Sequence, residues 1–114
     1  MIKVKRVYEP KSVDDGQWVL VERLWPRGIK REKIDLWLKD IAPSTELRIW
    51  FSHDPAKWEE FQKRYFAELE KNEAVKQVLK MASSGNITLV YAAKDIQRNS
   101  AIALQKYLKN ILSH

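Results

Sequence analysis

The chain has 114 residues, 45% of them hydrophobic and 32% charged, a composition typical of one globular domain. It contains no cysteine, which excludes disulfides, thiolate nucleophiles and cysteine-type zinc sites. No apolar run approaches the roughly 20 residues needed to cross a bilayer. The start of the chain also lacks the apolar segment of a signal peptide. We therefore expect a cytoplasmic protein that makes no membrane contact.

The formal net charge is +6, and it is unevenly distributed. Residues 1–33 hold nine Lys or Arg against five Asp or Glu, whereas residues 34–114 hold twelve against ten. This excess of positive charge in residues 1–33, here called the basic front, favours an anionic partner, either a small molecule or a nucleic acid. The alternative is that a lysine-rich surface simply keeps the protein soluble.

Three segments have the pattern of short strands. Ile2 and Val4 alternate with polar neighbours, which predicts a strand over roughly 2–8. The segments 17–24 and 87–91 contain continuous apolar runs, typical of strands that are covered on both faces.

Helical spacing of apolar residues predicts five helices between and after these strands. We expect them over about 29–41, 45–51, 55–71, 73–83 and 97–112. The clearest pattern places Trp58, Phe61, Tyr65 and Leu69 on one face of a helix.

The order of strand, strand, helices, strand and helix indicates an α/β fold. Because helices connect the second and third strands, those two strands should pair in parallel, through a right-handed crossover. We expect residues 1–114 to form one compact domain with a small, mainly parallel sheet flanked by helices.

Basic and aromatic residues gather where the predicted strands end. Open parallel sheets bind ligands beyond the carboxyl ends of their strands. Arg23, Trp25 and Arg27 follow the second strand, and Lys94 follows the third. We expect these four residues to border one pocket for a phosphate, sulfate or carboxylate, because a guanidinium binds two oxygens at once.

Further ligand-binding candidates are Asn99 and Ser100, in the first turn of the last helix, and Arg48. A helix N-terminus favours anions, since its free N–H groups point outward. The alternative is that Arg23 pairs with Glu22, Asp35 or Asp95 and only fastens its loop. Glu22 is the least suited of the three, because it directly precedes Arg23 and successive strand residues face opposite ways.

Catalytic candidates are few. His53 precedes a helix and could act as a general base, and Asp35 and Asp95 are possible acids or bases. The other histidine, His114, lies at the tail, so no spacing of metal ligands is present, and we expect neither a metal nor a cofactor. Trp25 could stack on a planar ring or fill the base of its loop, and we favour the second alternative.

The chain resembles the YeaO-like group within domain of unknown function 488. The motifs that carry the resemblance cover nearly the whole chain: Arg6-Val7-Tyr8, Asp15-Gly16, Val19 to Gly28, Trp37-Leu38-Lys39, Ala42 to Arg48, Trp50-Phe51, His53-Asp54 and Thr88 to Asp95. The resemblance implies a compact α/β domain and assigns no reaction. Members of this group often have an Asn-His-Ala-like run where this chain has Asn99-Ser100-Ala101, so any role of that histidine is absent or altered here.

Two classes of function follow. The first is a site for an anionic small molecule, whether or not a reaction occurs there. The alternative is a nucleic-acid-binding module that uses the basic front and Trp25. We favour the first because no helix-turn-helix, zinc knuckle or RNA-binding strand motif supports the second.

Overall fold

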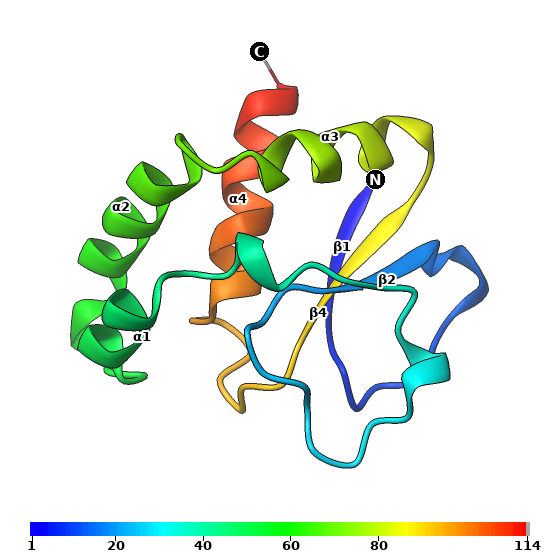
Figure 1. Ribbon diagram of the computed structural model, residues 1–114, viewed down its shortest axis with the longest axis horizontal. Coiled ribbons are helices and arrows are strands. Elements are labelled where there is room, and N and C mark those ends of the chain that lie inside the picture. Colours follow the sequence, from blue (N-terminus) through cyan, green and yellow to red (C-terminus); the bar gives the residue numbers. More distant parts are fainter. Residues whose placement is uncertain (114) are drawn as a thin grey trace.

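The computed structural model describes residues 1–113 and confirms the α/β fold. Four parallel strands form one sheet in the order β1-β4-β2-β3, and four α-helices accompany it (Figure 1). The elements are β1 (Ile2–Arg6), β2 (Gln17–Leu20), β3 (Leu36–Trp37), α1 (Thr45–Phe51), α2 (Trp58–Leu69), α3 (Ala74–Ser84), β4 (Ile87–Tyr91) and α4 (Ser100–Leu112). Short 3-10 turns connect several of them.

The last strand in the sequence, β4, lies in the middle of the sheet. Leu89 of β4 is opposite Val4 of β1 on one side and Val19 of β2 on the other. All five residues of β4 are buried, as a continuous apolar run predicts for a strand covered on both faces. The predicted parallel pairing of β2 with β4 is confirmed.

The two faces of the sheet are covered by different kinds of structure. The larger core cluster combines strand residues such as Leu89 with residues of all four helices, including Phe61 and Leu104. The smaller cluster contains Trp18 and Leu20 and is covered by loop residues, not by a helix. Most of these residues belong to the loop between β2 and β3, drawn in light blue and cyan in Figure 1, which lies on the side of the sheet away from α1 and α2. The helices therefore form one layer on one face.

A buried carboxylate fastens the connection between β1 and β2. Asp15, 1% exposed, accepts hydrogen bonds from Lys5 Nζ at 2.8 Å, Trp18 Nε1 at 2.9 Å and the backbone N–H of Ser12 at 2.9 Å. Burial alone would raise the pKa of Asp15, but these hydrogen bonds hold it well below its usual value. Asp15 thus stays charged while it joins both strands to the turn between them.

The helix predicted over 29–41 does not form. The segment contains strand β3 between two 3-10 turns, and Leu38 N–H donates to Leu20 O at 2.9 Å. The helical prediction required Ile34 and Leu38 to face the same way. In the structure they belong to different core clusters, on opposite faces of the sheet. Pairing with β2 therefore overrides the helical spacing.

The prediction for the α2 face is confirmed, since Phe61, Tyr65 and Leu69 are each 1% exposed and Trp58 packs against the core. Trp37 lies within the segment predicted as a helix, but in the structure it is on the edge strand β3 and is 37% exposed. Within residues 1–113, no helix has the length and apolar character required to span a bilayer.

Candidate functional site

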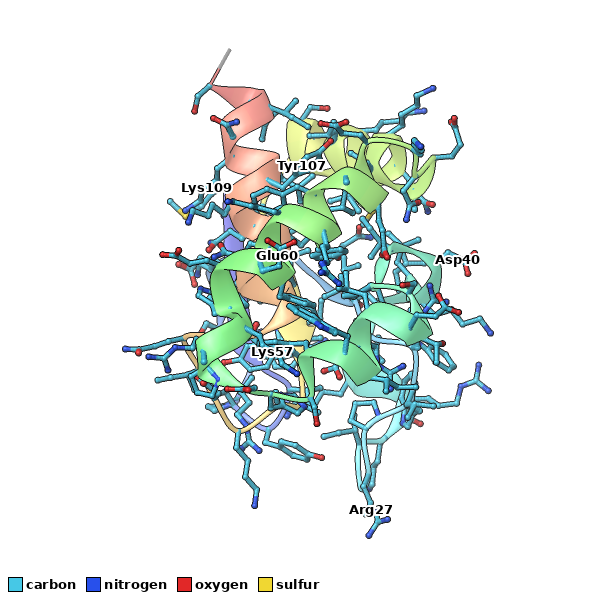
Figure 2. All side chains as sticks on the ribbon, turned by 90° about the vertical axis from the view of Figure 1, so that its left-hand side faces the viewer. Arg27, Asp40, Lys57, Glu60, Tyr107 and Lys109 are labelled. Carbon is cyan, nitrogen blue, oxygen red and sulfur yellow. The ribbon has the colours of Figure 1, made fainter. Side chains whose placement is uncertain are left out.

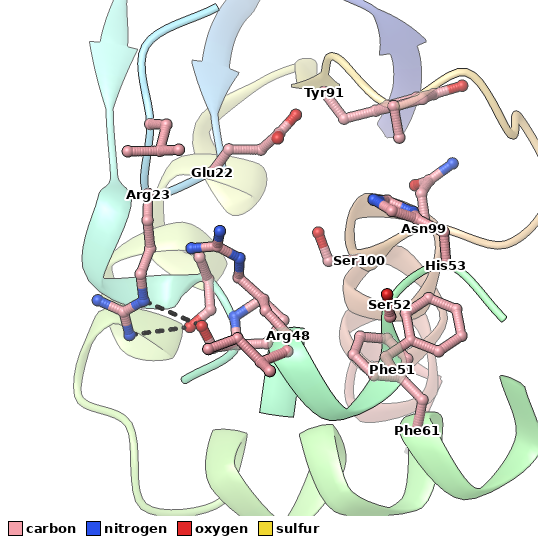
Figure 3. Close-up of a pocket in the computed structure, with 15 residues that line it drawn as sticks. Glu22, Arg23, Arg48, Phe51, Ser52, His53, Phe61, Tyr91, Asn99 and Ser100 are labelled. Carbon is pink, nitrogen blue, oxygen red and sulfur yellow. Dashed lines mark hydrogen bonds between the residues drawn. The ribbon is translucent and has the colours of Figure 1, made fainter. Parts of the chain in front are cut away.

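A pocket of about 320 Å³ opens where β2 and β4 end. Parallel strands present their carboxyl ends on the same edge of a sheet, and this edge is where α/β proteins bind ligands. The segment after β2, the helix α1 with its following turn, the end of β4 and the start of α4 together line this pocket (Figure 3). Its walls combine polar groups with the apolar side chains of Leu24, Ile49, Phe51 and Phe61.

Arg48 supplies an unpaired positive charge to the pocket. It lies on α1, whose start is capped by Ser44: Leu47 N–H donates to Ser44 Oγ at 3.1 Å. Figure 3 shows the Arg48 side chain extending into the space between β2 and α4. In residues 1–113 its guanidinium has no hydrogen-bond acceptor and no ion-pair partner. All of its donors are therefore available to a ligand.

Glu22 faces the same pocket from the end of β2. One of its carboxylate oxygens accepts a hydrogen bond from the backbone N–H of Ala92, which follows β4. Burial raises the pKa of Glu22, while the bond from Ala92 and the positive charges of Arg48 and His53 lower it, and burial dominates. Glu22 is thus a partly buried carboxylate, and no ion pair joins it to any residue in the described part of the chain.

The first turn of α4 presents donors to the pocket. Asn99 is buried and caps the helix: its side chain accepts from Ile102 N–H at 2.9 Å and donates to Asp95 O at 2.9 Å. The side-chain amide of Asn99 is therefore used in capping α4. Ser100 follows it, and neither its hydroxyl nor the N–H groups of Ser100 and Ala101 find an acceptor among residues 1–113. These groups are free to meet a ligand.

The turn after α1 forms another wall of the pocket. Ser52 and His53 have φ values of 45° and 55°, the only positive φ angles of non-glycine residues in the described chain. Two such residues in succession are unfavourable unless their surroundings hold them, and such strain is often found at functional sites. His53 is exposed and lies against Phe51, with ring centroids 6.0 Å apart. Its imidazole can therefore reach a molecule in the pocket.

The predicted site residues separate into two groups. Arg23, Arg48, Asn99, Ser100 and His53 line the pocket, but Trp25, Arg27 and Lys94 do not. The guanidinium of Arg23 donates to Pro43 O at 2.9 Å and Ala42 O at 3.3 Å, so it fastens its loop through carbonyls, not through the carboxylates we considered.

The other members of the predicted quartet lie elsewhere. Arg27 projects from the tip of the loop after β2 (Figure 2). Lys94 is exposed beyond β4. Trp25 packs edge-on against Trp37, with ring centroids 5.4 Å apart, and donates its indole N–H to Ile29 O at 2.8 Å. This geometry agrees with the second alternative for Trp25, in which it fills the base of the loop.

Neither predicted aspartate lines the pocket. Asp35 accepts from the backbone N–H of Trp18 at 2.7 Å and lies near Lys11 Nζ at 3.7 Å. Asp95 accepts from the N–H groups of Gln97 and Arg98 and so begins the turn into α4. His114 is outside the described residues, and among the others no three His, Asp or Glu side chains gather where they could hold a metal ion.

Comparison with known proteins agrees with the resemblance noted in the sequence. The model of the family DUF488-N3i, described as the inactive DUF488-N3 subclade, matches residues 1–114. The chain belongs to the DUF488-N3i family. It is 41% identical over 113 residues to the uncharacterized protein YeaO of Escherichia coli strain K12, covering 96% of this chain and 98% of YeaO.

A second relative of this DUF488-N3i protein is the uncharacterized protein Rv3073c of Mycobacterium tuberculosis strain H37Rv. The two are 40% identical over 109 residues, which cover 94% of this chain and 92% of the relative. No solved structure matches the chain.

Glu22 is the charged pocket residue that sequence reasoning missed. We considered it only as a partner of Arg23 and set it aside because successive strand residues face opposite ways. A signal was present nonetheless. Glu22 directly follows the buried run Val19-Leu20-Val21, so a carboxylate had to lie at the carboxyl end of a central strand.

Proposed function

We propose that this protein binds an anionic small molecule, one that bears a carboxylate or a phosphate, in the pocket where β2 and β4 end. The observation that carries the proposal is the free guanidinium of Arg48 opposite the free hydroxyl and N–H groups at the start of α4. A charged fork and a helix N-terminus are both recurrent anion-binding features. Here they line one pocket.

We further propose that the protein binds this molecule without turning it over. The family model is described as an inactive subclade. In the resemblance to the YeaO-like group, Ser100 also stands where members often have a histidine. The remaining histidine of the pocket, His53, has no hydrogen bond to a carboxylate of residues 1–113 that would orient it. Binding without chemistry fits both facts.

The proposal can be tested with two ligands, inorganic phosphate and 3-phenylpropanoate. Each is titrated into the protein, and binding is measured by calorimetry or by NMR chemical-shift changes. We expect saturable binding of at least one, with the largest shifts at Arg48 and Ser100. Arg48→Gln should weaken this binding about tenfold or more, because a hydrogen bond to a charged group contributes about 1.5–3 kcal/mol.

Arg27→Gln is the matched control, since it removes the same charge from a loop tip that does not line the pocket. We expect it to leave the affinity unchanged. Equal weakening by both substitutions would show that net charge, not the pocket, attracts the anion. Failure of both ligands to bind the unmodified protein would refute the proposal.

A further inference from the structure

The pocket contains two opposite charges that do not pair with each other. Glu22 extends into it from the end of β2, and Arg48 from α1 (Figure 3). No ion pair or hydrogen bond joins the two side chains. The positive charge of Arg48 is nevertheless close enough to lower the pKa of Glu22. A molecule that lies between them therefore meets a negative group on one side and a positive group on the other.

The second carboxylate oxygen of Glu22 is accessible and can accept a hydrogen bond from a ligand. One carboxylate oxygen is occupied by the N–H of Ala92, and the other has no partner in residues 1–113. A partly buried carboxylate without a cation is unfavourable, because burial removes water that would stabilise its charge. A purely anionic ligand would make this worse, whereas a ligand that also carries an ammonium or another N–H donor would relieve it.

The remaining walls suit an apolar body. Phe51 and Phe61 stack at 4.3 Å at the inner side of the pocket, and each is almost fully buried. Leu24 and Ile49 also line it, although they are 69% and 71% exposed. With the two phenylalanines, these aliphatic side chains offer apolar contact surface to a ligand, as in most small-molecule pockets.

We propose that the ligand is amphoteric: it carries a carboxylate or phosphate for Arg48 and the start of α4, a nitrogen donor for Glu22, and an apolar body for the aromatic wall. An α-amino acid with an aromatic or aliphatic side chain is the simplest member of this class. This inference rests on the anion-binding function proposed above, and it adds the donor group and the role of Glu22.

Three ligands of nearly equal shape test the inference on the unmodified protein. Phenylalanine has both charges, 3-phenylpropanoate lacks the ammonium, and phenethylamine lacks the carboxylate. Calorimetry at pH 7 gives the affinity of each ligand. Phenylalanine should bind at least about tenfold more tightly than either analogue, because only phenylalanine can pair with both Glu22 and Arg48.

Glu22→Gln then identifies the residue responsible. Glutamine keeps an oxygen that can accept the N–H of Ala92, so the link between β2 and β4 can persist. In this variant phenylalanine should lose its advantage over 3-phenylpropanoate, while 3-phenylpropanoate itself should bind at least as tightly as before. If the variant did not fold, the comparison of the three ligands on the unmodified protein would still decide.

The failures of the two proposals are distinguishable. If 3-phenylpropanoate binds through Arg48 and phenylalanine binds no more tightly, the amphoteric ligand is wrong and the anion site stands. The same conclusion follows if Glu22→Gln leaves the advantage of phenylalanine intact. If none of the three ligands binds, the amphoteric ligand is wrong, and the titration with inorganic phosphate decides separately whether the anion site stands.

Discussion

The carboxylate of Glu22 accepts a hydrogen bond from the backbone N–H of Ala92, so the residues that follow the two central strands are joined directly. This bond holds Glu22 at the edge of the pocket and occupies one of its two oxygens. It also places a group with a raised pKa beside the free guanidinium of Arg48. The charge state of Glu22 therefore controls how the pocket receives an anion.

Anion affinity should consequently rise as pH falls. The pKa of Glu22 lies above its ordinary value of 4.5. As pH decreases from neutrality through this raised pKa, Glu22 becomes neutral and no longer repels an anion near Arg48. We expect 3-phenylpropanoate, whose carboxylate has its own ordinary pKa near that of Glu, to bind more tightly at pH 5 than at pH 8.

Glu22→Gln removes the titrating group on which this prediction depends. The variant should bind 3-phenylpropanoate with little dependence on pH between 5 and 8. A pH profile unchanged from that of the unmodified protein would exclude Glu22 as the cause.

The raised pKa has a consequence for stability as well. A carboxylate whose pKa is higher in the folded state stabilises the fold below its unfolded pKa, and this contribution is lost as pH rises through the folded pKa. At pH 7 the charged Glu22 therefore opposes folding. Glu22→Gln should raise the melting temperature at pH 7 and have a smaller effect at pH 4. A decrease at pH 7 would show that the carboxylate is needed for the bond to Ala92.

Two glycines with positive φ should respond very differently to substitution by alanine. Gly16 has φ of 67°, and a Cβ there would lie 1.7 Å from the backbone oxygen of Asn86. Gly28 has φ of 77°, but a Cβ there would meet nothing within 4 Å. Gly28→Ala should cost about 1–2 kcal/mol, the ordinary cost of left-handed backbone. Gly16→Ala should cost considerably more, because β2 or the start of β4 must move. Chemical denaturation compares the two.

Phe61→Ala should destabilise the protein by about 3–5 kcal/mol. Phe61 is 1% exposed and stacks between Phe51 and Trp58, so its removal leaves a cavity that neighbouring elements cannot easily fill. Ile49→Ala is a control on an exposed position and should change stability by less than about 0.5 kcal/mol. If thermal unfolding of Phe61→Ala matched that of the parent, the core position of this helix face would be wrong.

We expect no tight binding to generic DNA or RNA at physiological salt. Many cations of this basic protein are already engaged: Lys11 and Lys33 lie over Trp18, Lys39 over Trp37, and Lys57 and Arg64 over Trp50. Indole faces covered in this way cannot stack on a base. Fluorescence anisotropy with mixed oligonucleotides at two salt concentrations tests this. Micromolar or tighter binding that persists at physiological salt would favour the nucleic-acid alternative.

The sequence predicted β1, β2, β4 and the four α-helices because their signals are local. Ser44 precedes α1 as a cap, and Phe61, Tyr65 and Leu69 recur at helical spacing on α2. The segment 29–41 was mispredicted because its partner, β2, is adjacent to it in the sheet but separated from it in the sequence. A two-residue strand has too few residues for a recognisable alternation.

Prediction of the site was limited in the same way. Strand ends indicated the edge of the sheet where the pocket lies, and Arg23 is among the residues that line this pocket. Sequence could not show that the guanidinium of Arg23 is used by the carbonyls of Ala42 and Pro43, whereas that of Arg48 is free. Which cation is available depends on the path of the loops, and that path is set by tertiary packing.

The central position of β4 determines when the protein can fold during its synthesis. β1 pairs only with β4, and Ile2 is matched with Ile87, so the first strand has no neighbour until most of the chain has been made. Before then, the ladder available to the nascent chain is the short pairing of β2 with β3. Contacts between such distant residues slow folding, because a long loop must close before they form. A ribosome-bound chain that ends before residue 87 should therefore remain sensitive to proteases, and protection should arise only once β4 has emerged.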